Sequence, residues 1–155
     1  MGNDKLCYST TIVAPVSPEK AVAFLRSPDG VGTWALGTWG ATPVVGEDDV
    51  YVGRSLLDGT EQSFFRILEE GAFGLVEYEV GETIDSLTMR IAAKVVAGKD
   101  FGYGADYCLV TLLGWRPQNM GDLRWQRLCA FHDVEILMIE ARLKGQWPPG
   151  QGSVP

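Results

Sequence analysis

The single histidine of this chain, His132, is the side chain best suited to acid–base chemistry. An imidazole titrates near neutral pH, and enzymes place such groups in apolar pockets. On a helical wheel of about 100° per residue, His132 lies in the middle of an apolar stripe on the last helical segment. The other members of this stripe are Trp125, Leu128, Cys129, Ile136, Ile139 and Leu143. His132 is therefore either a cavity-facing acid or base, or a packed ring that a nearby backbone carbonyl or carboxylate satisfies.

Burial among apolar side chains predicts a lowered pKa for His132, because burial disfavours the charged form of imidazole. Serine hydrolase chemistry lacks support, since the chain contains no G-x-S-x-G elbow. Cys129 lies one helical turn before His132, but cysteines packed in helices are usually unreactive. If the protein is an enzyme, we expect His132 to transfer a proton.

The cysteines and carboxylates are not spaced as metal ligands. Cys7, Cys108 and Cys129 are an odd number without C-x-x-C spacing, which argues against a disulfide framework and against a zinc knuckle. A single histidine excludes a multi-histidine site, and the carboxylates are scattered. We therefore expect three unpaired cysteines, no metal and no cofactor.

Charged residues on the predicted strands offer a second kind of chemistry. Arg54, Arg66 and Arg90 lie on different strands and could converge on a ligand carboxylate. Strand alternation places Arg90 outward and leaves the directions of Arg54 and Arg66 open. Glu77 and Glu79 alternate with apolar residues, so we expect them to point outward rather than to form a carboxylate pair in a pocket.

Length and composition indicate one globular domain. The chain has 155 residues, of which 46% are hydrophobic and 21% charged, values typical of a single folded domain. Its net charge of −7 argues against nucleic acid as a partner. No apolar run approaches the roughly 18 residues of a membrane-spanning helix, so we expect no membrane insertion and a cytoplasmic location. The domain should cover residues 1–147, followed by a disordered, Pro- and Gly-rich tail over residues 148–155.

The order of the predicted elements is typical of an α+β fold. Residues 5–14 are rich in Thr, Tyr, Ile and Val, which predicts a first strand. Ser17 and Pro18 begin a short helix over residues 18–26, and residues 32–36 are expected to form a further helical turn. Short apolar runs separated by turn residues then predict an antiparallel meander. These runs cover residues 41–45, 50–57, 62–68, 73–80, 86–96 and 105–115.

A long helix should follow, starting between residues 119 and 122 and ending at residue 145. It is long enough to cross a whole sheet. Opposite the stripe around His132 it carries a second apolar stripe, formed by Leu123, Ala130, Val134, Leu137 and Ala141. One stripe suffices to cover a sheet, so the second either packs under a loop or meets another subunit. We place a homodimer interface through Leu123, Ala130, Val134 and Leu137 ahead of a contact within the chain.

Two stretches resemble proteins of the START-like superfamily, also called SRPBCC. The stretch TTIVAPVSPEKAVAFLRSPDGVGTW resembles the opening of these proteins, in which a strand ends in Ala-Pro and runs into a helix and a tryptophan. The stretch LRWQRLCAFHDVEILMIEARLKG is similar to their long C-terminal helix, which ends in Leu-Lys. The superfamily includes Bet v 1-like proteins and polyketide cyclases. The resemblance implies a helix-grip fold, in which a curved antiparallel sheet of about six or seven strands wraps around the long helix and two short helices follow the first strand.

The resemblance also implies an apolar cavity between the sheet and the long helix, occupied by a small hydrophobic molecule such as a polyketide, an aromatic compound or a lipid. The expected ligand contacts are Trp34, Tyr78, Met89, Ile91, Tyr107, Trp125, Leu128, Cys129 and Ile136. Two alternatives remain open. The first is a polyketide cyclase or dehydratase in which His132 transfers a proton and Tyr78 or Tyr107 orients a carbonyl group. The second is a protein-interaction module whose cavity is filled by side chains.

Overall fold

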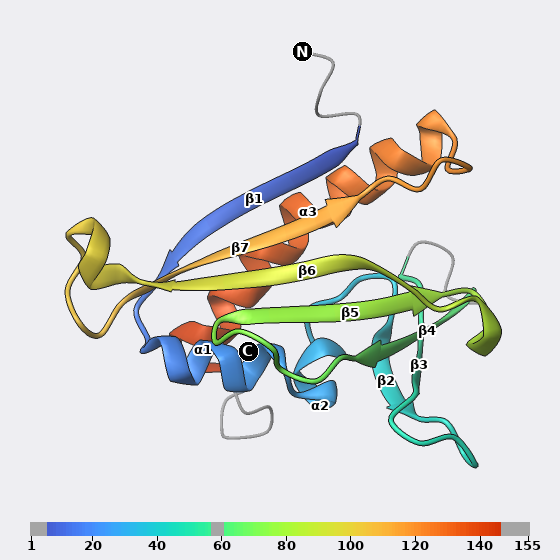
Figure 1. Ribbon diagram of the computed structural model, residues 1–155, viewed down its shortest axis with the longest axis horizontal. Coiled ribbons are helices and arrows are strands. Elements are labelled where there is room, and N and C mark those ends of the chain that lie inside the picture. Colours follow the sequence, from blue (N-terminus) through green and yellow to red (C-terminus); the bar gives the residue numbers. More distant parts are fainter. Residues whose placement is uncertain (1–5, 57–60, 147–155) are drawn as a thin grey trace.

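A seven-stranded antiparallel sheet forms the framework of the molecule (Figure 1). The computed structural model describes residues 6–56 and 61–146, so the predicted tail over residues 148–155 lies outside the described residues. The strand order is β1-β7-β6-β5-β4-β3-β2, which makes β1 and β2 the two edges. The strands are Cys7–Ala14 (β1), Trp39–Pro43 (β2), Tyr51–Arg54 (β3), Gln62–Ile67 (β4), Leu75–Gly81 (β5), Thr88–Ala97 (β6) and Cys108–Trp115 (β7).

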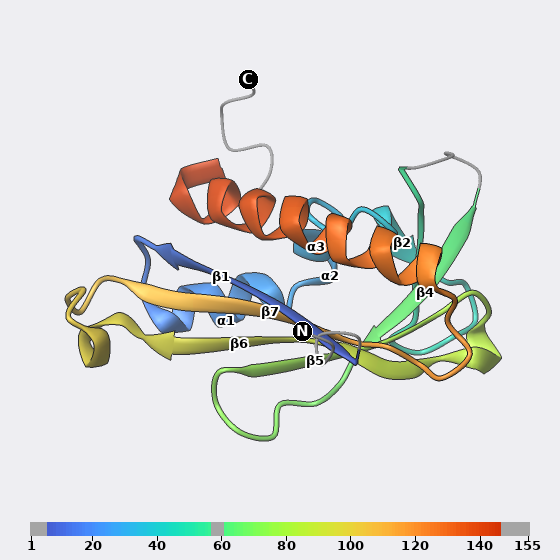
Figure 2. The ribbon, with the colours of Figure 1, turned by 90° about the horizontal axis from the view of Figure 1, so that it is seen from above.

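One long helix, α3 (Asp122–Ala141), lies across one face of the sheet (Figure 2). Strands β2 to β4 bend toward the beginning of this helix, so that the sheet curves around it. Two short helices, α1 (Pro18–Leu25) and α2 (Pro28–Val31), connect β1 to β2. Helix α1 packs against β5, β6 and β7, and α2 packs against β2. The predicted α+β helix-grip architecture is therefore confirmed.

Both short helices begin at a Ser-Pro pair. The hydroxyl groups of Ser17 and Ser27 each accept a hydrogen bond from the backbone N–H three residues later, and a proline occupies the first turn of each helix. This is the usual chemistry of a helix start. The second helical segment begins earlier than the predicted turn over residues 32–36, because Ser27 and Pro28 start it. Hydrogen-bonded turns from Val31 to Trp34 and Ala35 follow this helix.

Helix α3 is fixed to the sheet by one buried side. It packs on β1 and β7, and Ile136, Ile139 and Leu143 are part of the main hydrophobic core. A π-helical turn, Arg142–Gln146 (η4), follows α3 and contains Gly145 with a φ of 138°. Only glycine adopts such an angle without strain, so the helical segment ends where the sequence predicts. None of the described helices is long and apolar enough to span a membrane.

The cysteines of β1 and β7 lie at opposite ends of that strand pair. Cys7 is opposite Trp115, and Cys108 is opposite Ala14. Seven residues of strand, roughly 23 Å, separate these two positions along β1, which is far beyond the reach of a disulfide. Both side chains are free thiols, as predicted.

A β-bulge interrupts the pairing of β5 with β6. Tyr78 is paired with Ile91, whereas the next residue of β5, Glu79, is paired with Met89, so Arg90 is an extra residue on β6. A bulge of this kind re-aims the side chains of its strand. Met89 therefore shares the outer face with Glu79, while Arg90 is half-buried on the inner side. The predictions of an inward Met89 and an outward Arg90 were both wrong.

Short 3-10 turns at Ile84–Ser86 (η2) and Gly98–Phe101 (η3) precede and follow β6.

Candidate functional site

A cavity of about 620 Å³ lies between the first half of α3 and the inner face of the sheet. Strands β4, β5 and β6 form one wall, and residues 31–38, which follow α2, form another. This volume is typical of small-molecule sites, which range over about 300 to 1,000 Å³. The larger apolar side chains that line it are Val31, Trp34, Phe65, Tyr78, Val80, Ile91, Met120, Leu123, Leu128 and Phe131.

The structure places Trp34, Tyr78, Ile91, Leu128 and His132 at the cavity, as the sequence predicted. Trp34 and Tyr78 are buried and form an edge-to-face pair, with ring centroids 5.9 Å apart. The two rings come from the segment after α2 and from β5, so they join these two walls. Whether these residues contact a ligand stays a prediction.

The other predicted contacts do not line the cavity. Met89 points outward beyond the bulge, and Tyr107 is exposed in the turn before β7. Trp125 and Ile136 are buried outside the cavity, on the side of α3 that packs on the sheet, and Cys129 belongs to the same stripe. As cavity-lining residues these predictions were wrong for three reasons. The bulge turns Met89 outward, and Tyr107 lies in an exposed turn. Of the α3 stripe that holds Trp125, Cys129 and Ile136, only Leu128 and His132 line the cavity.

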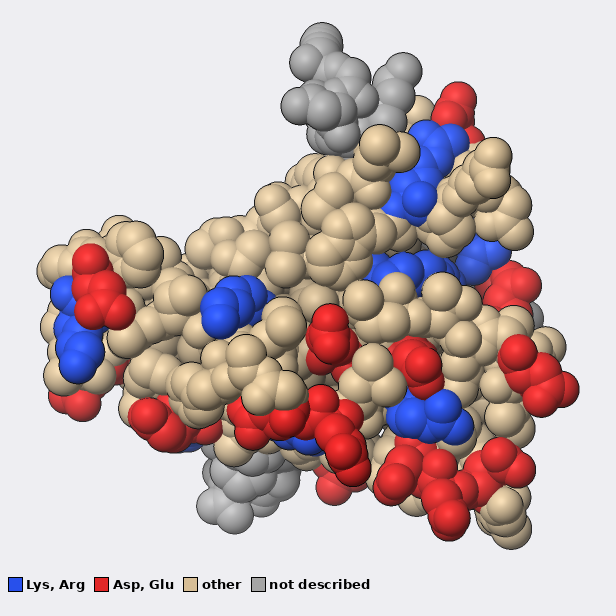
Figure 3. Space-filling view, viewed as in Figure 1, with Lys and Arg blue, Asp and Glu red and all other residues tan. Residues whose placement is uncertain are grey.

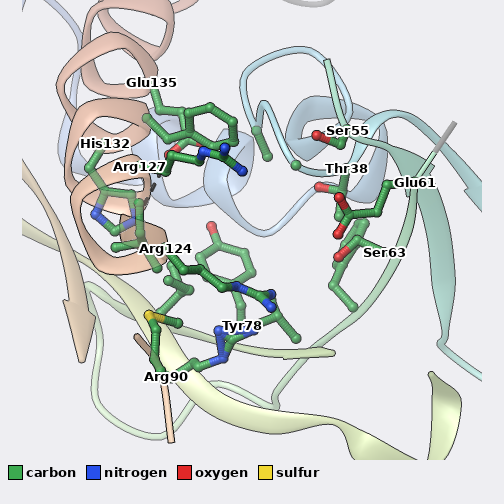
Figure 4. A pocket seen from close by; sticks show the side chains of 18 of the residues that line it. Thr38, Ser55, Glu61, Ser63, Tyr78, Arg90, Arg124, Arg127, His132 and Glu135 are labelled. Carbon is green, nitrogen blue, oxygen red and sulfur yellow. Dashed lines mark ion pairs between the residues drawn. The ribbon is translucent and has the colours of Figure 1, made fainter. Parts of the chain in front are cut away.

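His132 is held between α3 and β7 with 3% of its surface exposed. Its ring covers Gly114 of β7 so closely that a Cβ atom at this glycine would lie 2.7 Å from Cε1 of the imidazole. The Nε2 atom is 3.8 Å from Oε1 of Glu135, too long for a hydrogen bond, and Nδ1 has no partner within the described ranges. The other carboxyl oxygen of Glu135 accepts a hydrogen bond from the N–H of Leu36 at 2.8 Å. Figure 4 shows the two side chains together on α3, at the edge of the cavity.

Burial moves the pKa values of these two side chains in opposite directions. It lowers the pKa of His132 to about 4, although the charge of Asp133 acts the other way. It raises the pKa of Glu135 to about 7, although the hydrogen bond from Leu36 acts the other way. At pH 7 the imidazole is therefore neutral and the carboxyl group is about half protonated. The two groups are neighbours but do not form an ion pair at this pH.

Tyr78 is less available for chemistry than the sequence suggested. Its hydroxyl group donates a hydrogen bond of 2.6 Å to the carbonyl oxygen of Leu25 in α1. Burial raises the pKa of Tyr78 well above its usual value, so the phenol stays protonated. The proton that would orient a substrate carbonyl is already donated to the protein. Tyr78 therefore serves chiefly to join α1 to β5 beneath the cavity.

Polar side chains occupy two opposite walls of the cavity (Figure 4). One wall carries Thr38, Ser55, Glu61 and Ser63. The other carries Arg90, Arg124 and Arg127. Of the three arginines that the sequence suggests as ligands of a carboxylate, only Arg90 lines the cavity. Arg66 instead forms a salt bridge of 2.9 Å with Glu79, and neither Arg66 nor Arg54 lines the cavity.

Glu135, Arg124 and Arg127 also line the cavity, although the sequence pattern did not single them out. All three lie on α3 among the charged residues between the two apolar stripes, where the pattern predicts contact with solvent. A signal for Glu135 was its position three residues after the only histidine, which places both side chains on neighbouring turns of one helix. The described residues contain no group of three or more His, Cys, Asp or Glu side chains suited to a metal ion.

Comparison with known proteins supports the fold. No protein-family model matches this chain, and no curated protein sequence matches it. Among solved structures, a START superfamily protein from Mycobacterium smegmatis superimposes with a TM-score of 0.60 at 11% identity, over 89% of this chain and 97% of that chain. The Aha1 protein of Colwellia psychrerythraea, solved as a dimer, gives a TM-score of 0.62 at 17% identity, over 95% and 99% of the two chains.

A third similar structure is DynU16, a protein of the dynemicin biosynthetic locus. It superimposes with a TM-score of 0.56 at 11% identity, over 90% of this chain and 47% of that chain. At such identities the likeness establishes a common fold and no more. The chain thus shares the helix-grip fold of START superfamily proteins.

Proposed function

We propose that this helix-grip domain binds a small molecule with a mainly apolar body in the cavity between α3 and the sheet. The observation that carries the proposal is the cavity itself, about 620 Å³ in volume and lined by Trp34, Phe65, Ile91, Leu128 and other apolar side chains. A well-formed apolar cavity with a few polar groups is the usual form of a small-molecule site. The START-like fold adds support, although at low identity.

The protein-interaction module and the homodimer, which the sequence also suggests, differ in their support. An interaction module with a filled cavity has less, because the space between helix and sheet is open. Self-association through the second stripe stays a prediction: Val134 and Leu137 are 47% and 58% exposed on α3, whereas Leu123 also lies at the cavity.

A tryptophan at position 63 tests the binding proposal. Ser63 lies on the cavity wall formed by β4, so the indole of Ser63→Trp should occupy space that a ligand needs. We expect this variant to bind a neutral naphthalene dye, 6-propionyl-2-(dimethylamino)naphthalene, at least about tenfold more weakly than the wild type, a loss of about 1.4 kcal/mol. Dye fluorescence measures the affinity, and native mass spectrometry of fresh protein compares co-purifying molecules.

The control is Leu137→Trp, which adds the same ring on the exposed side of α3. Equal dye affinity in Ser63→Trp and wild type would place the binding site elsewhere.

Proton abstraction from a bound carbon acid is a second candidate function, favoured by the pair of His132 and Glu135. A general base works best when its pKa is near the working pH. Glu135, with a pKa raised to about 7 by burial, meets this condition better than His132, whose pKa is lowered to about 4. In this scheme the carboxylate of Glu135 takes the proton, and the neutral imidazole of His132 packs beside it and hydrogen-bonds the substrate.

Deuterium exchange tests this second candidate. The central CH₂ group of benzoylacetone exchanges in D₂O when a base removes its proton, and NMR follows the loss of signal. A catalytic Glu135 predicts a rate that rises with pH through about 7, because the carboxylate is the active form. We expect Glu135→Gln to abolish the accelerated exchange, His132→Gln to reduce it, and Glu140→Gln, away from the cavity on the same helix, to leave it unchanged. If the wild type exchanges benzoylacetone no faster than buffer, the protein is not a catalyst of this class.

A further inference from the structure

Three arginines from two elements line one side of the cavity. Arg124 and Arg127 extend from the first half of α3, and Arg90 rises from the bulge of β6 (Figure 4). Arg90 reaches this place only because the bulge turns it inward. A guanidinium group offers a rigid set of N–H donors that matches carboxylate and phosphate oxygens.

These arginines are poorly neutralised by the protein. Arg124 forms a salt bridge of 3.0 Å with Glu82. Arg90 and Arg127 make no ion pair or hydrogen bond with any other described part of the chain. Half-burial and the neighbouring charge of Arg124 lower the pKa of Arg90, while Glu82 acts the other way. An anion close to all three groups would relieve this repulsion.

The acidic side chains of the cavity do not supply that anion. Asp122 is paired with Arg116 at 2.6 Å, and Glu135 is directed to the N–H of Leu36. Glu61 lies on the facing wall, across the cavity from the arginines. The mouth of the cavity therefore has a local excess of positive charge.

The excess stands out because the whole chain has 20 acidic and 13 basic residues. In Figure 3, acidic side chains spread along the lower edge of the molecule, whereas basic side chains gather near the beginning of α3. A positive cluster on such an acidic protein is not the by-product of a generally basic surface.

We infer that the ligand carries an anionic oxygen head group, a carboxylate or a phosphate, which Arg90, Arg124 and Arg127 hold at the mouth while the apolar body of the ligand fills the cavity. This inference rests on the proposed binding function and names the class of ligand. The arginine side is charged and near solvent, and the region around Trp34, Phe65 and Tyr78 is apolar and buried, so the ligand lies with its head outward.

Calorimetric titration of the full chain with matched naphthalene probes tests the inference. The probes are 2-naphthoate, 2-naphthyl phosphate and the neutral methyl 2-naphthoate, which share one apolar body. We expect the wild type to bind at least one of the two anions about tenfold or more tightly than the ester, as a charge-assisted hydrogen bond implies. The tighter anion identifies the head group as carboxylate or phosphate. Added NaCl should weaken binding of the anions and not of the ester.

Arg127→Gln is the decisive variant, because Arg127 is exposed and its replacement should not disturb folding. It should lower the affinity for the preferred anion about tenfold and leave the ester unchanged. Arg90→Gln should also lower the affinity for the anion and leave that for the ester unchanged. Because Arg90 is half-buried, thermal unfolding checks that this variant is still folded. The matched control, Lys99→Gln in the distant turn η3, removes one charge and should change neither affinity.

Ester binding as tight as anion binding in the wild type would overturn the inference and leave the binding function standing. Failure to bind any probe would overturn both.

Discussion

Glu135→Gln should stabilise the protein at pH 8 by about 3 kcal/mol, because it removes a buried charge and keeps the shape of the side chain. Burial raises the pKa of Glu135 from 4.5 to about 7, so at pH 8 the carboxylate is charged inside the protein. Glutamine retains an oxygen that accepts the hydrogen bond from the N–H of Leu36, now 2.8 Å long. Urea denaturation of the variant and the wild type at pH 8 measures the difference in unfolding free energy.

The same variant should also change how stability depends on pH. The raised pKa of Glu135 contributes stability that is complete below pH 4.5 and is lost as the pH rises through about 7. The lowered pKa of His132 contributes stability that is present above pH 6.5 and is lost as the pH falls through about 4. The two contributions oppose each other between pH 4.5 and 6.5, so in the wild type they nearly cancel there.

In Glu135→Gln only the contribution of His132 remains. The unfolding free energy of the variant should then rise by about 3 kcal/mol more than that of the wild type between pH 4 and pH 6.5. Glu140→Gln, outside the cavity on α3, is the control and should follow the wild-type profile. A Glu135→Gln protein less stable than the wild type at pH 8 would show that the carboxylate has a favourable charged partner.

Gly53→Ala should destabilise the protein by about 3 kcal/mol, at the upper end of the range for overpacked sites. A Cβ atom at Gly53 would lie 2.3 Å from both the carbonyl carbon and the oxygen of Thr38. The obstacle is backbone, which cannot rotate away as a side chain can. Strand β3 would have to separate from the segment that carries Thr38, and this segment is a wall of the cavity.

Gly37→Ala provides the matched control for this prediction. It lies next to Thr38, and a Cβ atom there would meet nothing within 4 Å. Its replacement should be neutral or stabilise by up to about 1 kcal/mol, because alanine has fewer unfolded conformations to lose. Thermal and urea unfolding of both variants test the contrast. If Gly53→Ala unfolded within about 0.5 kcal/mol of the wild type, the contact between β3 and this segment would be looser than described.

Periodic patterns predicted the fold well because they report which sides of elements are buried. Alternation on β5 predicted that Glu77 and Glu79 point outward, and the residues that alternate with them, Val76 and Tyr78, are buried inside. The same rule failed at Met89 and Arg90, because a bulge inserts one residue without changing the composition of the strand. Single-sequence periodicity cannot detect such an insertion, since it depends on the partner strand.

The helix shows a second limit of pattern analysis. The apolar stripe of α3 marked the side that packs on β1 and β7, as Ile136 and Ile139 show. The side toward the cavity is mixed: Leu128 and Phe131 are followed by Glu135, and arginines precede them. A helix side that faces an open cavity meets space or ligand instead of protein, so its residues need not be apolar. Two residues of the stripe, Leu128 and His132, line the cavity, whereas Arg124, Arg127 and Glu135 line it from outside the stripe.

An anion that approaches this molecule meets two electrostatic fields in turn. Far from the surface the net charge of −7 repels it, and near the mouth Arg90, Arg124 and Arg127 attract it. Salt at physiological strength screens charges that are more than about 8 Å apart, so it weakens the long-range repulsion more than the attraction at close range. Small anions can then reach the mouth by diffusion, whereas long polyanions must bring many charges against the acidic surface at once. The distribution of charge thus selects anions by size before any contact inside the cavity.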